Sequence, residues 1–126
     1  MEGLGRLGWC AVDCADPVRL AAFWSHVLGM EIDEGYLGDP PRYVGLIPAT
    51  SGGPVITFNR VPEPKSVKNR LHFDVEVNEV ESATARVLEL GGHRAPTDDF
   101  DEYGFRWRVM SDPEGNEFCL IFGTAS

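Results

Sequence analysis

The stretch that decides the fold is residues 70–79, RLHFDVEVNE, in which apolar and polar side chains alternate. Strict alternation of this kind is typical of a strand with one buried face. The segment VESATARVLELGG follows at once, with apolar residues at helical spacing and two glycines at its end. Glycine commonly ends a helix, so these residues predict a strand that leads directly into a helix.

The same pattern occurs near the N-terminus. Residues 7–16, LGWCAVDCAD, alternate and lead into PVRLAAFWSHVLG, where Asp16 is the expected N-cap and Pro17 lies in the first turn. When the two strands are aligned, His72 lies 63 residues after Trp9, which is half of the 126-residue chain. The sequence therefore indicates a duplicated unit, and such units usually form one binding site between their halves.

Further strand-like stretches complete each half. They are MEIDEG (30–35), RYVGLIP (42–48) and VITFNRV (55–61) in the first half, and residues 93–95, FRWRVM (105–110) and EFCLIF (117–122) in the second. The intervening DPEGN is a turn, and PTDDFDEYG (96–104) is expected to be a polar loop or a lid.

The predicted fold class is α+β, with the order βαβββ repeated twice. We expect a single domain of residues 1–126, made of a module 7–61 and a module 70–122. Residues 62–69 contain two prolines and no apolar periodicity, which is typical of a linker.

Composition narrows the classes of function. A net charge of −9 argues against nucleic acid, which needs a basic face to neutralise phosphates. No apolar run approaches the length of about 18 residues that a membrane span requires. The N-terminus lacks the basic start and apolar middle of a signal peptide, so a cytoplasmic location is expected, with the three cysteines reduced.

The direction of each side chain follows from the helices. Each helix must cover the apolar face of its sheet, so the opposite faces are expected to line an enclosed space. The residues predicted on these inward faces are Trp9, Ala11, Asp13, Thr57, Asn59, His72, Asp74, Glu76, Glu117, Cys119 and Ile121. In FRWRVM the same reasoning buries Trp107 and turns Arg106, Arg108 and Met110 inward, although Trp107 would also suit a pocket wall.

Four segments carry a resemblance to a known family. They are DCADPVRLAAFWSHVLGM, RLHFDVEV, LELGGHRA and FRWRVMSDPEGNEFCLIF. Together they resemble the vicinal oxygen chelate superfamily, in particular its glyoxalase-like (glyoxalase/bleomycin resistance/dioxygenase) domains, over residues 7–122. The resemblance implies paired βαβββ modules that form a half-barrel, often in domain-swapped or side-by-side dimers, so a homodimer is expected.

Metal-dependent members of that superfamily place one His, Gln or Glu ligand on the first and the last strand of each module. The matching positions here are Trp9, Thr57, His72 and Cys119. His72 is a usual ligand and Cys119 can bind a soft metal as a thiolate, whereas an indole cannot and a hydroxyl is poor. A catalytic divalent metal normally needs three protein ligands, so we expect no metal and no other cofactor. The alternative is a metal displaced toward Asp13, Asp74 or Glu76.

Three residues are candidates for acid–base catalysis: His72, Asp74 and Glu76. An imidazole changes its charge near neutral pH, which suits a general base, but His72 is also expected to be hydrogen-bonded to a neighbour such as Asp74, Glu76 or Thr57. The inward acids, Asp13 among them, either form ion pairs with Arg106 and Arg108 or include one that abstracts a proton from a carbon acid.

A further set of residues is expected to contact a ligand. Trp9 fills the space that a metal would take and can stack on a planar molecule. The other candidates are Asp13, Thr57, Asn59, Trp107, Arg108 and Cys119. The favoured function is metal-independent binding or sequestration of a metabolite or drug. The alternatives are a lyase, isomerase or dioxygenase-type enzyme that uses His72 with an inward carboxylate, and a partner-binding module without a ligand.

Overall fold

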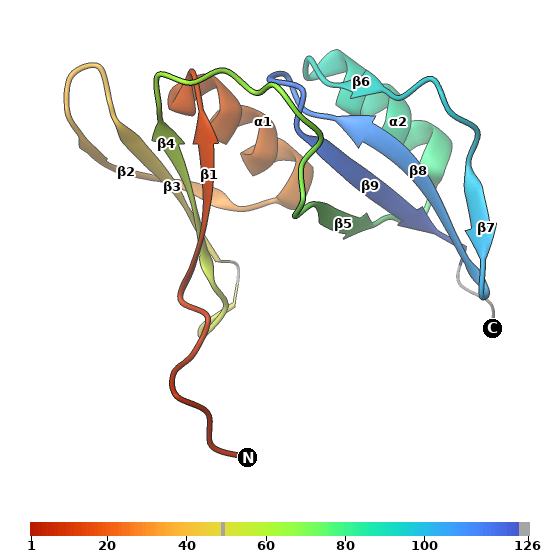
Figure 1. The fold of residues 1–126 in the computed structure, drawn as a ribbon, viewed down its shortest axis with the longest axis horizontal. Coiled ribbons are helices and arrows are strands. Elements are labelled where there is room, and N and C mark those ends of the chain that lie inside the picture. Colours follow the sequence, from red (N-terminus) through yellow and green to blue (C-terminus); the bar gives the residue numbers. More distant parts are fainter. Residues whose placement is uncertain (49, 124–126) are drawn as a thin grey trace. The chain divides into compact units, whose positions relative to one another are not determined.

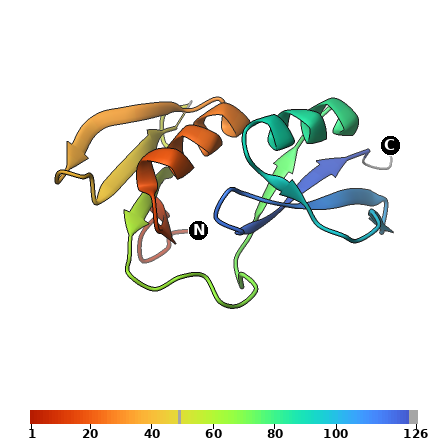
Figure 2. The same ribbon diagram turned by 90° about the horizontal axis from the view of Figure 1, so that it is seen from above.

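The computed structural model describes residues 1–48 and 50–123, except for the side chains of residues 34–37 (Figure 1). The chain divides into two compact units, Met1–Pro64 and Lys65–Ser126, which are described one at a time. Each unit has one long helix and one sheet, and in each the helix runs across one face of its own sheet (Figure 2).

The first unit begins with β1 (Trp9–Cys14) and α1 (Pro17–Leu28). The helix starts where the Asp16 carboxylate accepts the backbone N–H of Arg19 at 3.2 Å, and it ends at Gly29 in the left-handed conformation. Its strands β2 (Glu31–Leu37), β3 (Tyr43–Ile47) and β4 (Val55–Arg60) give the sheet order β1-β4-β3-β2, in which only β1 and β4 run parallel. The apolar face of this sheet packs under α1. The core between them contains Val44, Leu46 and Phe58 from the sheet and Leu20, Phe23 and Trp24 from the helix.

The second unit repeats the order with β5 (Phe73–Glu76), α2 (Val80–Glu89), β6 (His93–Arg94), β8 (Phe105–Ser111) and β9 (Glu117–Phe122). Its sheet order is β5-β9-β8-β6, with β5 parallel to β9, and the additional strand β7 (Phe100–Glu102) pairs with β8. The α+β class and the repeated βαβββ order are thus confirmed. Within the described residues, no helix combines the length and the apolar character needed to cross a membrane.

The strand predicted at 70–77 is shorter than its alternation suggests. Its first paired residue is Phe73, which lies opposite Phe118, and Leu71 is 76% exposed although it was expected to be buried. The partner strand β9 starts at Glu117, whose carboxylate accepts the backbone N–H of Asn69 at 2.9 Å. Continued toward the N-terminus, this register places residues 70 and 71 opposite residues 115 and 116, before β9 begins, so the strand cannot start as early as predicted.

The segment 96–104, expected as a loop or lid, contains the strand β7. Tyr103 and Gly104 both have positive φ, at 53° and 81°, and positive φ at both central residues is the mark of a two-residue type I′ hairpin turn. Phe100 lies opposite Trp107, and their rings stack with centroids 5.3 Å apart. The prediction was wrong because a Tyr-Gly turn lacks the usual Asn-Gly or Asp-Gly signal.

The inward direction predicted for Arg108 and Met110 is also wrong. Arg108 lies opposite Leu120 and Met110 lies opposite Phe118, and all four side chains are buried on the face that α2 covers. Directly opposed residues of an antiparallel pair share a face. Trp107 lies opposite Ile121, so it points to the uncovered face, in agreement with the alternative that made it a pocket wall.

Candidate functional site

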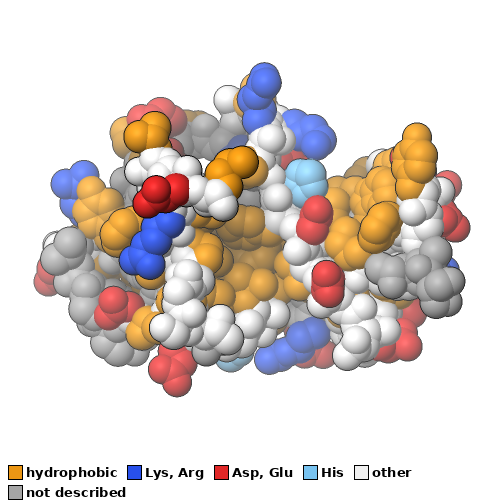
Figure 3. Space-filling view, turned by 90° about the horizontal axis from the view of Figure 1, so that it is seen from below, with side chains coloured by type: hydrophobic (Ala, Val, Ile, Leu, Met, Phe, Trp, Pro, Cys, Tyr) orange, Lys and Arg blue, Asp and Glu red, His pale blue; other side chains and the backbone are white. Residues whose placement is uncertain are grey.

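The face of the second sheet that α2 leaves uncovered holds a cavity of about 620 Å³. All its walls come from β5, β7, β8, β9 and the residues next to them. The lining residues are His72, Asp74, Glu76, Glu102, Tyr103, Phe105, Trp107, Cys119 and Ile121. Figure 3 shows this face in its right-hand part, where a pale-blue histidine and red carboxylates border orange apolar side chains.

The strand register explains why these side chains meet. One cross-strand row runs from Glu76 to Ile121 and on to Trp107, and a neighbouring row joins Asp74 to Cys119. Directly opposed side chains lie about 5 Å apart, so each row forms a continuous surface. An apolar floor therefore lies beside a polar end, in an open cavity of a size that suits a small organic molecule.

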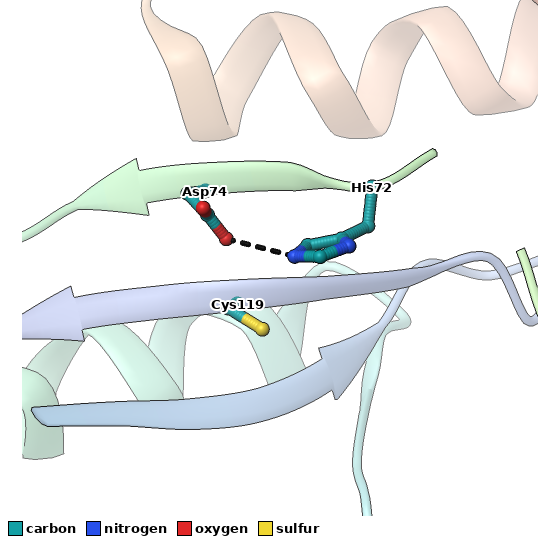
Figure 4. Close-up of side chains that lie close together, drawn as sticks. All are labelled: His72, Asp74 and Cys119. Atoms are coloured by element: carbon teal, nitrogen blue, oxygen red, sulfur yellow. Dashed lines mark ion pairs between the residues drawn. The ribbon is translucent and has the colours of Figure 1, made fainter. Parts of the chain in front are cut away.

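The polar end is a group of three side chains, His72, Asp74 and Cys119 (Figure 4). The His72 Nε2 atom lies 3.1 Å from an Oδ1 of Asp74, which confirms the expectation that His72 pairs with a neighbour. The donor atoms of all three residues lie within 4.8 Å of one another. Imidazole, carboxylate and thiolate are all ligands of Zn²⁺, so the kinds of donor fit a borderline metal.

Electrostatics act against the thiolate form of Cys119. The side chain is buried, at 8% exposure, and burial raises the pKa of its thiol. The negative charge of Asp74 raises that pKa further, while Lys68 opposes it weakly. At neutral pH the sulfur therefore carries a proton, which a metal ion would have to displace.

Beside Ile121, the apolar floor of the cavity consists of aromatic side chains. Trp107 is partly buried and stacks on Phe100, with an interplanar angle of 11°. Phe105 and Tyr103 are exposed near the β7–β8 turn. These rings present flat surfaces on the open side of the cavity, where a planar ligand can stack.

Arg108 takes no part in this cavity, because it lies on the opposite face of the sheet. It is 5% exposed, and its guanidinium donates two hydrogen bonds of 2.8 Å to the carboxylate of Asp99 and one of 2.9 Å to the hydroxyl of Thr84. Glu81 completes the ion pairs. The hydrogen bond from Arg108 holds the pKa of Asp99 below its ordinary value. The ion pairs expected between Arg108 and the inward acids are therefore replaced by pairs with Asp99 and Glu81.

The remaining candidates, Trp9, Asp13, Thr57 and Asn59, belong to the first unit. They share the uncovered face of its sheet, where Asp13 lies opposite Asn59 and Thr57 lies opposite Ala11. Trp9 is 69% exposed, and the Oδ1 atom of Asn59 is buried without a hydrogen-bond partner in the described part of the chain. Their role in a site shared by both halves stays a prediction.

Four lining residues were not among the predicted site residues, namely Glu102, Tyr103, Phe105 and Ile121, although Ile121 was predicted on an inward face. Glu102 lies opposite Phe105 across the β7–β8 turn. The available signal was the alternation of Phe100 and Glu102, which matches that of Phe105 and Trp107 across a two-residue turn. The polar composition of residues 96–104 favoured a loop and obscured that alternation.

Comparison with known proteins places the chain in a family. A family model described as a glyoxalase-like domain matches residues 9–121. The chain belongs to this family. The resemblance to the glyoxalase/bleomycin resistance/dioxygenase superfamily is thereby confirmed. None of the curated proteins matches the chain.

Solved structures of glyoxalase-like proteins share the fold at low sequence identity. A glyoxalase/bleomycin resistance protein/dioxygenase family enzyme from Burkholderia phytofirmans PsJN has a TM-score of 0.74 and 20% identity, covering 94% of this chain and 99% of its own. The oxidase ChaP-H2 has a TM-score of 0.67 and 17% identity, with 98% and 100% covered. A superfamily member from Sphaerobacter thermophilus DSM 20745 has a TM-score of 0.67 and 17% identity, with 94% and 98% covered.

Proposed function

We propose that this glyoxalase-like protein binds a small organic molecule, a metabolite or a drug, and that it does so without a resident metal. The observation that carries the proposal is the cavity of about 620 Å³, with an aromatic floor and a few polar groups at one end. Small-molecule sites typically combine apolar walls with a few convergent polar groups. We propose in addition a homodimer in the cytoplasm, as the sequence led us to expect.

Two features support metal independence. The family positions in the first unit hold Trp9 and Thr57, which offer no good metal ligand. In the second unit the raised pKa of the Cys119 thiol and the pairing of His72 with Asp74 both compete with a metal ion. Binding a metal there means displacing the thiol proton of Cys119 and separating His72 from Asp74.

The binding function is tested with 1-N-phenylnaphthylamine, a neutral probe whose fluorescence rises in apolar sites. We expect saturable binding, weakened at least roughly tenfold in Trp107→Ala because the stacking surface is lost. Leu88→Ala is the matched control, because Leu88 is an exposed apolar residue of α2 outside the cavity. Equal weakening in both variants, or unsaturable binding, would contradict the proposal.

The second candidate is an acid–base enzyme of the lyase, isomerase or dioxygenase type. The grouping of His72, Asp74 and Cys119 favours it, since these residues would hold a Zn²⁺ or a similar ion. Such an ion, when bound, supplies a Lewis acid that polarises a carbonyl or lowers the pKa of water. In either form, the contact of Nε2 with Asp74 holds the ring of His72 and leaves Nδ1 for proton transfer.

Titration with Co²⁺ separates the two candidates, because a cobalt–thiolate bond has a characteristic near-ultraviolet absorption. The binding proposal predicts no such band and less than about 0.2 equivalents of transition metal in protein purified without chelator. A stoichiometric band that disappears in Asp74→Asn but persists in Asp98→Asn would favour the metal enzyme. Asp98 is the control because it is an exposed acid outside the cavity.

A further inference from the structure

We infer that the cavity of the second unit selects flat apolar molecules that carry a positive charge. This inference rests on the proposed binding function and names the class of ligand. Two observations support it: the sign of the charges in the cavity wall, and their position relative to the aromatic floor.

The wall carries charge of one sign. Three carboxylates line the cavity, those of Asp74, Glu76 and Glu102, and no lysine or arginine is among the described residues that do so. Asp74 already has a partner, because it pairs with His72. The side-chain carboxylates of Glu76 and Glu102 have neither a hydrogen bond nor an ion pair within the described parts of the chain. Two negative charges are therefore available to a ligand.

The two available carboxylates border the aromatic floor from opposite strands. Glu76 on β5 lies opposite Ile121, which lies opposite Trp107, which in turn lies opposite Phe100 on β7. Glu102 follows Phe100 two residues later and so lies on the same face of β7. A flat molecule stacked on Trp107 thus lies between two carboxylates, and a cationic substituent on either side meets one.

The polar end of the cavity is less open to a cation. There the carboxylate of Asp74 already has a partner in His72, whose Nε2 atom lies 3.1 Å away, and the positive charge of Lys68 acts on Cys119. This end suits a neutral polar group of the ligand. The cation is therefore expected beside Glu76 or Glu102, and not beside Asp74.

The test uses three molecules with one skeleton: 2-naphthylmethylamine as the cation, 2-naphthylmethanol as the neutral form and 2-naphthoate as the anion. Dissociation constants are measured by calorimetry at about 50 mM salt. Exposed ion pairs contribute up to about 1 kcal/mol each, so the single pair that the ammonium forms with Glu76 or Glu102 predicts roughly fivefold tighter binding of the cation than of the alcohol. The anion should bind most weakly, and salt should reduce the preference.

Charge-removing variants locate the effect. The double variant Glu76→Gln/Glu102→Gln should bring the cation-to-alcohol ratio down to about one, while Glu89→Gln on α2, an exposed acid outside the cavity, should leave it unchanged. If the alcohol binds the native protein as tightly as the amine, the charge inference is overturned and the binding function stands. Absence of binding by all three molecules at millimolar concentration would overturn both.

Discussion

The uncovered faces of the two sheets have the same backbone register and different chemistry. In the first unit Ala11 lies opposite Thr57, and in the second Asp74 lies opposite Cys119. The residue two positions earlier is Trp9 in one case and His72 in the other. The strand pairing therefore supports the alignment of the two halves. The halves differ in the residues at these aligned positions.

Of these differences, the one between Ala11 in the first unit and Asp74 in the second has the largest effect on the chemistry of the face. An aspartate at this position holds the imidazole of His72 and raises the pKa of the Cys119 thiol, whereas an alanine can do neither. The first unit in turn has the exposed indole of Trp9 and the buried amide oxygen of Asn59, which has no hydrogen-bond partner among the described residues. The parallel strand pairing is the same in both sheets, while the second sheet brings His72, Asp74 and Cys119 together beside a cavity.

The largest difference that mutation can reveal lies under the helices. Helix α1 covers an apolar face, whereas the face under α2 contains the buried guanidinium of Arg108. Arg108→Ala removes the bonds from the guanidinium to Thr84 and Asp99 and leaves a cavity, while Val80 and Arg94 remain as other partners of these two groups, so we expect a loss of about 3 kcal/mol in the free energy of unfolding. Urea denaturation followed by circular dichroism measures it.

The control for this change is Arg106→Ala. Arg106 is exposed, and its guanidinium lies 4.9 Å from the centre of the Phe122 ring, a contact that contributes less than about 1 kcal/mol. If both variants lose the same free energy of unfolding, the buried ion pairs of Arg108 contribute no more than the exposed contact of Arg106. The proposed contrast between the two helix-covered faces would then be wrong.

A second prediction concerns acid. Because the pKa of Asp99 lies below its unfolded value, its ionised form favours the folded state above about pH 4, and this contribution is lost as the pH falls through the folded pKa. The urea concentration at the midpoint of unfolding should therefore decrease as the pH is lowered from 5 to 2, and this decrease should be smaller in Asp99→Asn. Asp98→Asn, which lacks the bond to Arg108, should behave like the native protein.

Part of the acid response will persist in Asp99→Asn. Burial tends to raise the pKa of Glu117, but the backbone N–H of Asn69 and the ammonium of Lys65 outweigh it, so the net pKa is lowered. This acid therefore stabilises the second unit in the same direction and over the same range of pH. If the urea midpoint of Asp99→Asn did not change with pH over this range, Asp99 would account for the whole acid response and Glu117 for none of it.

The smallest effect compares one cysteine from each unit. Burial raises the pKa of the Cys10 thiol, and burial together with Asp74 raises that of Cys119. Removing the negative charge in Asp74→Asn lowers the pKa of Cys119, so its alkylation by iodoacetamide at pH 8 should accelerate a few-fold, by about 0.5 kcal/mol or more of electrostatic energy. Mass spectrometry of the two peptides measures both rates, and the rate at Cys10 should not change.

Local signals predicted most of the fold. Asp16, Pro17 and Gly29 delimit α1 in the sequence as they do in the structure, because caps act through neighbouring backbone groups. The start of β5, the existence of β7 and the direction of Arg108 depend on which strand lies alongside, and alternation within one strand carries no such information. The His72–Asp74 pair was open to prediction because the two residues are two positions apart on one face.

The site was predicted in part for the same reason. Residues of β5 and β9 were placed on the correct face, and Trp107 was placed there only in the alternative interpretation. A register count through the DPEGN turn pairs Ser111 with Glu117, and so Val109 with Cys119 and Trp107 with Ile121. That register predicts that the side chain of Trp107 shares the face of Ile121 and that the side chain of Arg108 points to the opposite face.

The contacts of Arg108 also bear on how the second unit opens. One guanidinium joins β8 to Thr84 and Glu81 of α2 and to Asp99 in the segment before β7. Each of these elements loses a bond to the same guanidinium when it separates from the others. The backbone amides of α2 and β8 should therefore exchange with deuterium in a single cooperative opening, while those of the β7–β8 turn exchange independently and faster.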